Sequence, residues 1–197
     1  MSNAPNRWTI KSARTVYNNR WIMVREYETV APTGADAQYG LVHMHNLALG
    51  VVPIDDQGQT ILIGQERFCF GRYSWELPEG GGPEGQPPLM GAQKELAEEA
   101  GLKAANWLPL FEDVHFSNSV TDERAHAFIA WNLSQEPGFA RDSSEELSVR
   151  RVPFAEALRM AVSGEITDGF TLVMLLKADH LLRTGALPHE LARLMQA

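Results

Sequence analysis

The amino-acid sequence predicts an α+β fold in which helices sandwich a mixed β-sheet. Strand patterns fill the first sixty-odd residues, helical patterns begin only at residue 89, and the two do not alternate as regular βαβ units would. The chain has 197 residues, of which 44% are hydrophobic and 21% charged, and this ordinary globular usage excludes a disordered chain. The length fits one medium-sized domain with a short N-terminal addition.

The N-terminal part of the chain carries the pattern of an antiparallel hairpin. A β-rich run over 21–30 ends before the turn signal Pro32–Gly34. Residues 38–45 then alternate between small or apolar and polar side chains, as the partner strand of a hairpin would. We therefore expect an N-terminal β-rich hairpin over residues 1–45 and a main domain over 46–197.

The main domain begins with a buried strand and contains a glycine-rich loop before its first helix. Residues 47–54 are almost continuously apolar, and a further strand is expected over 60–63. Glycines and prolines over 78–88 exclude a helix or a central strand there, so we interpret this stretch as a loop. A helix is expected over 89–100, with Gly101 at its left-handed C-cap.

The remainder of the chain predicts two strands followed by three helices. The strands are expected over 111–115 and 125–133, joined by a polar loop. Pro153 is typical of the first turn of a helix, which Gly164 would end. An apolar-faced helix is expected over 170–182, with a short terminal helix after it.

The helix expected over 89–100 carries its acidic residues on one side. At 100° per residue, Glu95, Glu98 and Glu99 fall within one narrow arc. Four apolar residues lie on the opposite side and are expected to face the core: Leu89, Ala92, Leu96 and Ala100. Two interpretations of the acidic side stay open. It is either a solvated surface on which Lys94 pairs with Glu98, or a site for hard divalent cations such as Mg²⁺.

Two stretches together resemble the signature of the Nudix hydrolase family: Glu76–Gly80 and Lys94–Leu102. That signature is a glycine, five residues, a glutamate, seven residues, and then Arg-Glu-apolar-x-Glu-Glu-x-Gly-apolar. With its glycine set at Gly80, seven of the nine fixed positions match. The two departures are Gln86, which carries no charge, and Lys94, which keeps a positive charge without the planar fork of a guanidinium.

The resemblance implies a Nudix-like α/β/α sandwich with a mixed sheet, preceded by the N-terminal antiparallel hairpin. In this family the helix glutamates and a backbone carbonyl of the preceding loop hold a divalent metal. By resemblance the metal is Mg²⁺, with Mn²⁺ as a second candidate, and its ligands are Glu95, Glu98, Glu99 and the backbone carbonyl of Glu79. The backbone at Gly80 and Gly81 is expected to approach the substrate closely.

Further stretches resemble the ADP-ribose and nucleotide-sugar pyrophosphatase branch of this family: Gln65–Phe68, Glu76–Pro78 and Gly164–Asp168. In that branch the arginine that matches Arg67 contacts the diphosphate of the substrate. A glutamate in the polar loop between two later strands helps to activate water, and Glu123 is the matching residue. Asp122 and Glu98 stay open as alternative bases.

The predicted function is the Mg²⁺-dependent hydrolysis of the diphosphate bond in a nucleoside diphosphate linked to a sugar, such as ADP-ribose. The products would be a nucleoside monophosphate and a sugar phosphate. The alternative is a degenerate Nudix domain that binds ADP-ribose or a related nucleotide without cleaving it. Gln86 and Lys94 favour this alternative, and the complete set of helix glutamates opposes it.

Composition limits the partners and the location that we expect. The net charge of −8, without a basic cluster, argues against a nucleic-acid partner. No stretch reaches the roughly 18 apolar residues of a membrane span. The single cysteine, Cys69, fits a reducing compartment, and we expect the cytoplasm.

The N-terminal hairpin also predicts an oligomer. A two-stranded element is only marginally stable in water by itself. We therefore expect residues 1–45 to pack against a second copy of the chain in a two-fold homodimer, where they would help to wall the substrate pocket.

Overall fold

The computed structural model describes residues 7–138 and 146–196. These residues form two compact units. The first unit combines the N-terminal residues up to Asn46 with the segment His115–Arg124, and the second contains Leu47–Val114 and the chain from Ala125 onward. No helix in the described ranges is both long enough and apolar enough to span a membrane.

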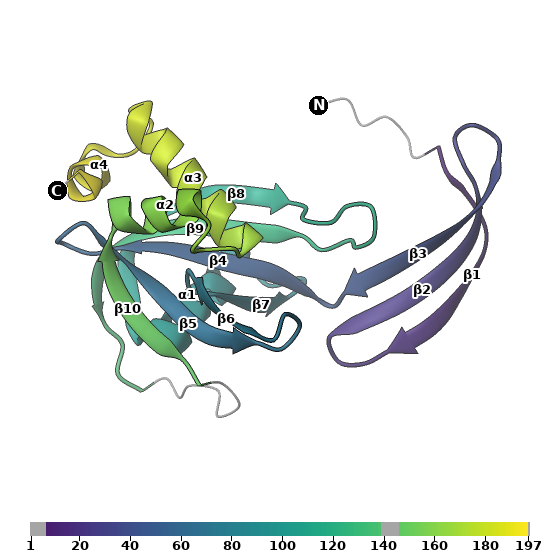
Figure 1. The fold of residues 1–197 in the computed structure, drawn as a ribbon, viewed down its shortest axis with the longest axis horizontal. Helices are drawn as coiled ribbons and strands as arrows, with labels where there is room; N and C mark the ends of the chain where they lie inside the picture. The colour runs from purple at the N-terminus through teal and green to yellow at the C-terminus, as the bar shows by residue number, and fades with distance from the viewer. Residues whose placement is uncertain (1–6, 139–145, 197) are drawn as a thin grey trace. The chain divides into compact units, whose positions relative to one another are not determined.

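The first unit is built on a three-stranded antiparallel sheet, in the order β1-β2-β3 (Figure 1). Its strands are β1 (Thr9–Asn18), β2 (Ile22–Val30) and β3 (Asp36–Met44). Strands β2 and β3 form the predicted hairpin, and β1 is an addition to it. All ten residues of β1 are exposed, so the strand lacks the apolar alternation by which a half-buried strand is recognised in a sequence.

The segment 115–124 joins this sheet through hydrogen bonds to β3. The Val42 N–H donates to the Val120 carbonyl at 2.8 Å, and the Asp122 N–H donates to the Val42 carbonyl at 3.3 Å. The Tyr39 hydroxyl donates to the Ser119 carbonyl at 2.6 Å. A segment distant in sequence therefore completes the N-terminal unit.

The second unit contains a mixed four-stranded sheet, in the order β7-β4-β9-β8. Strands β4 and β9 run parallel, whereas β8 and β9 run antiparallel, which confirms the predicted mixed sheet. Its strands are β4 (Asn46–Ile54), β7 (Glu79–Pro83), β8 (Leu102–Val114) and β9 (Ala125–Gln135). A second, antiparallel sheet has the order β10-β5-β6, with β5 (Gln59–Arg67), β6 (Arg72–Glu76) and β10 (Ser148–Pro153).

The described part of the second unit also contains four helices, which Figure 1 labels. They are α1 (Pro88–Ala100), α2 (Phe154–Ser163), α3 (Gly169–Arg183) and α4 (His189–Met195). Gly101 has a φ of 67° and ends α1 in the left-handed conformation, as predicted. Pro153 lies just before α2 rather than within its first turn, because the residue also ends strand β10.

The alternation of side chains along β4 places helices on both faces of the mixed sheet. The Leu49 side chain lies against Gly91 of α1. The next residue, Gly50, faces α3, because a Cβ there would lie 2.6 Å from the Met174 sulfur. Successive residues of a strand point to opposite faces, so α1 and α3 cover opposite sides and the predicted α/β/α sandwich is confirmed.

The core on the α1 side explains the apolar face of that helix. Ala92 and Leu96 are buried there, with Leu89 and Ala100 packed at the margin, as the helical spacing predicts. The buried residues of this cluster are Val51, Ile61, Ile63, Ala92, Leu96, Leu102, Phe128 and Ala130. This packing fixes the rotation of α1 and therefore the direction of its acidic side.

Candidate active site

The acidic side of α1 packs against the glycine-rich stretch. Residues Glu79–Pro83 form the edge strand β7 rather than the loop expected from the sequence. The Glu79 N–H donates to the Glu99 carboxylate at 2.9 Å. A Cβ at Gly80 would overlap the Glu95 carboxylate, so any side chain there would displace this carboxylate where the strand crosses the helix.

Burial separates the three glutamates of α1. Glu95 and Glu99 are only 8% and 5% exposed, so the solvated-surface interpretation is wrong for these two residues. Glu98 is more open and accepts a hydrogen bond from the Lys94 ammonium at 2.8 Å, which is the i,i+4 pair of that interpretation. The helix therefore directs two carboxylates toward β7 and keeps the third in a surface ion pair.

A second group of carboxylates, which we call the acidic cluster, consists of Glu76, Glu79 and Asp168. One oxygen from each residue lies within 4.8 Å of the others. Glu76 ends β6, Glu79 begins β7, and Asp168 caps the N-terminus of α3, where it accepts from the Thr171 N–H at 2.7 Å. The sequence predicts no role for these three side chains, although Glu76 and Asp168 lie in stretches that resemble the pyrophosphatase branch and Glu79 lies in the stretch that resembles the Nudix signature.

Thr171 connects the first turn of α3 to the chain between the two strands. Its hydroxyl accepts from the Leu77 N–H at 2.9 Å and donates to the Glu79 carboxylate at 3.5 Å. Thr171 is fully buried, so this contact is shielded from water. The helix cap and the strand end are thereby held together at the acidic cluster.

Arg67, at the end of β5, is the cation of the acidic cluster. Its Nε donates to both oxygens of Glu76, at 2.9 and 3.0 Å, and its Nη2 contacts Glu76 and lies 3.4 Å from Glu79. The hydrogen bond to Glu76 raises the pKa of the Arg67 guanidinium above its ordinary value. Arg67 therefore stays charged. Because Glu76 and Glu79 already bind its guanidinium, only part of that group is left for the diphosphate contact that the sequence predicts.

The electrostatics of Glu79 show that the cluster is short of positive charge. Burial raises the pKa of the Glu79 carboxyl well above its ordinary value, and the neighbouring Asp168 and Glu76 carboxylates raise it further. Arg67 lowers it without cancelling these effects. Hard oxygen donors with excess negative charge are what Mg²⁺ and Mn²⁺ bind, so the residues present fit a divalent cation.

The acidic cluster lines a cavity of about 770 Å³ within the second unit. The tip of the β5–β6 hairpin and the N-terminus of α3 form its other walls. The lining residues are Gln65, Glu66, Arg67, Phe68, Cys69, Phe70, Arg72, Ser74, Glu76, Glu79, Thr167, Asp168 and Gly169. A cavity of this size accommodates a nucleotide-sized ligand.

The two candidate bases in the 115–124 segment have different surroundings. The Asp122 carboxylate lies 2.6 Å from His43 Nδ1 and accepts from the Met44 N–H at 3.0 Å. These contacts fasten the segment to β3, which is a structural role. Glu123 is half-buried, and its N–H donates to the Thr121 hydroxyl at 3.2 Å.

The remaining predicted positions lie on the surface of the glycine-rich stretch. Gly81 is exposed in β7, and Gln86 is exposed in the turn that leads to α1. Gln86 also borders a small space between that turn and β4.

Comparison with known proteins identifies relatives of this chain. A family model described as the NUDIX domain matches residues 44–168. An ADP-ribose pyrophosphatase of Mycobacterium tuberculosis is 32% identical over 177 residues, which cover 88% of this chain and 84% of that protein. A GDP-mannose pyrophosphatase of Escherichia coli is 32% identical over 132 residues, which cover 62% of this chain and 69% of that protein.

A solved structure is similar over almost the whole chain. The crystal structure of an ADP compounds hydrolase matches with a TM-score of 0.81, covering 93% of this chain and 98% of that one. The sequence identity is 22%, so this likeness bears on the fold. It confirms the sandwich inferred from the packing around β4.

Proposed function

Because the chain belongs to the Nudix hydrolase family, we propose that it hydrolyses the diphosphate bond of a nucleoside diphosphate linked to a sugar, with ADP-ribose as the first candidate. The observation that carries this proposal is the junction of β7 with α1, where the Glu79 N–H meets Glu99 and Gly80 meets Glu95. The pyrophosphatases that are 32% identical to this chain support the substrate class. The products would be a nucleoside monophosphate and a sugar phosphate.

The residues proposed to hold Mg²⁺, or Mn²⁺ in its place, are Glu95, Glu98, Glu99 and the backbone carbonyl of Glu79. A bound cation supplies positive charge that screens the diphosphate oxygens from an attacking water. The burial of Glu95 and Glu99 against β7 fixes their carboxylates before any ligand arrives. Glu98 would have to leave Lys94 in part to reach a cation, so we assign it the weaker contact.

The chain's other residues are proposed to position substrate and water. Arg67 holds Glu76 and Glu79 through Nε and Nη2, which leaves Nη1 to donate to a diphosphate oxygen. The backbone at Gly80 and Gly81 would approach the substrate. Glu123 is the proposed general base, and Glu98 is the alternative; the contacts of Asp122 with His43 and Met44 favour Glu123 over its neighbour.

The alternative of binding without cleavage depends on the two departures from the Nudix signature. Gln86 is exposed, and Lys94 pairs with Glu98 on the surface of α1. Neither departure removes one of the two buried carboxylates that face β7. Hydrolysis is therefore the better-supported function.

The test is a panel of nucleotide sugars and dinucleotides with millimolar Mg²⁺, assayed for products that a phosphatase can release. ADP-ribose and GDP-mannose are its first members, and a parallel series contains a chelator. Hydrolysis that stops with chelator supports the proposal. Hydrolysis that survives chelation contradicts the metal assignment, and binding without product would establish the alternative.

We also propose that residues 1–45 act as a dimerisation element, separate from the catalytic domain of residues 46–197. Strand β1 is the edge of the N-terminal sheet and is exposed along its whole length, which leaves unpaired backbone groups open to a partner. Among the described residues up to 45, the large apolar side chains that are exposed are Trp8, Ile10, Val16, Tyr17 and Trp21.

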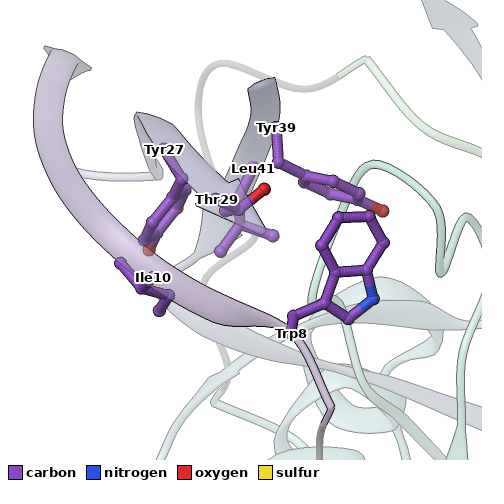
Figure 2. Close-up of a pocket in the computed structure, with 6 residues that line it drawn as sticks. All are labelled: Trp8, Ile10, Tyr27, Thr29, Tyr39 and Leu41. Atoms are coloured by element: carbon purple, nitrogen blue, oxygen red, sulfur yellow. The ribbon is translucent and has the colours of Figure 1, made fainter. Parts of the chain in front are cut away.

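The same unit contains an apolar pocket of about 300 Å³ (Figure 2). It is lined by Trp8, Ile10, Tyr27, Thr29, Tyr39 and Leu41. The Trp8 and Tyr39 rings meet edge to face, with centroids 5.6 Å apart.

Light scattering tests the proposed dimer. At micromolar concentration the protein should have the mass of a dimer, and a monomer near the chain mass of 21.9 kDa would contradict the proposal.

A further inference from the structure

Two arginines line the cavity, and they differ in how far neighbouring carboxylates neutralise their charge. Arg67 and Arg72 are directly opposite each other in the β5–β6 hairpin. The Arg67 guanidinium is bound to the carboxylates of the acidic cluster. Among the described residues no carboxylate lies within ion-pair distance of Arg72, whose Nη2 donates to the neutral Thr167 hydroxyl at 3.0 Å.

A second neutral contact also orients the Arg72 guanidinium. Its central carbon lies 5.7 Å from the centroid of the Phe70 ring, within the range of a cation–π contact. Phe70 and Thr167 both line the cavity themselves. Arg72 is therefore held at the cavity wall by groups that orient its charge without neutralising it.

The two opposed arginines are unfavourable for the stability of the β5–β6 hairpin. Like charges directly opposite in an antiparallel pair destabilise a sheet. The acidic cluster offsets the charge of Arg67, whereas the charge of Arg72 stays available to a ligand. An arginine in this state is suited to bind an anion, because its planar fork makes two charge-assisted hydrogen bonds to phosphate oxygens.

We propose that Arg72 is a substrate-binding residue that contacts the diphosphate group of the ligand in this cavity, and that Phe70 and Thr167 position it. The inference rests on the proposed function for the identity of the ligand. It gives the two arginines different roles, since Arg67 chiefly holds the carboxylates of the acidic cluster and Arg72 supplies the net positive charge toward the diphosphate.

The experiment measures the binding of ADP and of adenosine by calorimetry, with Mg²⁺ present, to the wild type and to Arg72→Met. ADP carries the diphosphate that Arg72 would contact, whereas adenosine carries none. Arg72→Met should weaken ADP binding by about 10- to 100-fold, the size of one or two charge-assisted hydrogen bonds, and leave adenosine binding unchanged. A general structural role would weaken both ligands alike.

Two further variants complete the test. Arg72→Lys keeps the charge without the planar fork, so it should recover only part of the ADP affinity. Arg150→Met is the matched control, because Arg150 also contacts an aromatic ring, with its guanidinium 5.9 Å from the Trp75 centroid, but does not line the cavity. Its affinity for ADP should equal that of the wild type.

The outcomes separate this inference from the proposed function. The inference is overturned if Arg72→Met binds ADP as tightly as the wild type does. It is also overturned if the wild type does not bind ADP, even if the enzyme hydrolyses a nucleotide sugar. Equal weakening of ADP and adenosine overturns it as well. A wild type that binds ADP through Arg72 but hydrolyses no member of the substrate panel overturns the proposed function and leaves the inference standing.

Discussion

Two groups of carboxylates in the second unit are positioned by different forces. The acidic cluster of Glu76, Glu79 and Asp168 comes from three segments; ion pairing to Arg67 holds the two glutamates, and Asp168 caps α3. The buried helix pair, Glu95 and Glu99, is held by the packing of α1 against β7. Ion pairing makes a group sensitive to pH and charge, whereas packing fixes side chains that a ligand can then use.

The difference predicts opposite responses to mutation. Neutralising a member of the helix pair should affect activity far more than stability. Neutralising a member of the acidic cluster should change how stability depends on pH. A single variant that loses activity and also changes the pH dependence of stability would show that the two groups form one functional site.

The largest effect is expected for Glu99→Gln, which should abolish hydrolysis of ADP-ribose while the fold stays intact. The amide oxygen can still accept from the Glu79 N–H, but the charge proposed to bind Mg²⁺ is lost. The readouts are steady-state turnover and circular dichroism. Glu156→Gln, on α2 and paired with Arg159, is the control and should keep wild-type turnover. Wild-type turnover in Glu99→Gln would remove the helix pair from the catalytic site.

A smaller loss is expected for a residue that belongs to neither group. Glu123→Gln should lower kcat by about 10²- to 10⁴-fold, the usual contribution of a general base. Asp122→Asn serves as the comparison, because the Asp122 carboxylate is bound to His43 and Met44. This variant should have a lower melting temperature and a kcat close to that of the wild type. If Glu123→Gln turns over like the wild type, Glu98 or Asp122 must be the base.

The acidic cluster should reveal itself through pH. Burial and like charge raise the pKa of Glu79 above the ordinary value of 4.5. Between pH 4.5 and this raised pKa, the Glu79 carboxyl keeps its proton in the folded metal-free protein and has lost it in the unfolded chain. Its contribution to the free energy of unfolding is therefore present below pH 4.5 and is lost as pH rises through the higher folded-state pKa.

Urea unfolding in chelator, at a series of pH values above 4.5, measures this loss. Glu79→Gln should flatten the decline, because the amide has no proton to release. Glu84→Gln, at an exposed position in the turn before α1, should leave the decline unchanged. An unaltered pH profile in Glu79→Gln would mean that another group is responsible.

The helix pair could be predicted from the sequence because its geometry is local. Helical spacing alone places Glu95 and Glu99 on one side and Leu96 on the other, and Gly101 marks the C-cap. The continuous apolar run of β4 likewise follows from burial on both faces.

The acidic cluster could not be predicted, because it exists only through tertiary structure. Nothing local to Asp168 indicates that capping α3 brings it within 4.8 Å of Glu76 and Glu79. The strand β7 escaped recognition for a similar reason. Its glycines argue against a strand on propensity, and its place at the sheet edge beside α1 overrides that preference.

The proposal that α1 and β7 form a divalent-cation site is tested most directly by thermal melting with and without Mg²⁺. A ligand at ten times its Kd stabilises the folded state by about 1.4 kcal/mol, which is a few degrees for a domain of this size. Wild type and Glu156→Gln should show this shift, whereas Glu95→Gln and Glu99→Gln should shift much less and be at least as stable as wild type without metal. Equal shifts in all four proteins would show that Mg²⁺ binds elsewhere and would contradict the proposal.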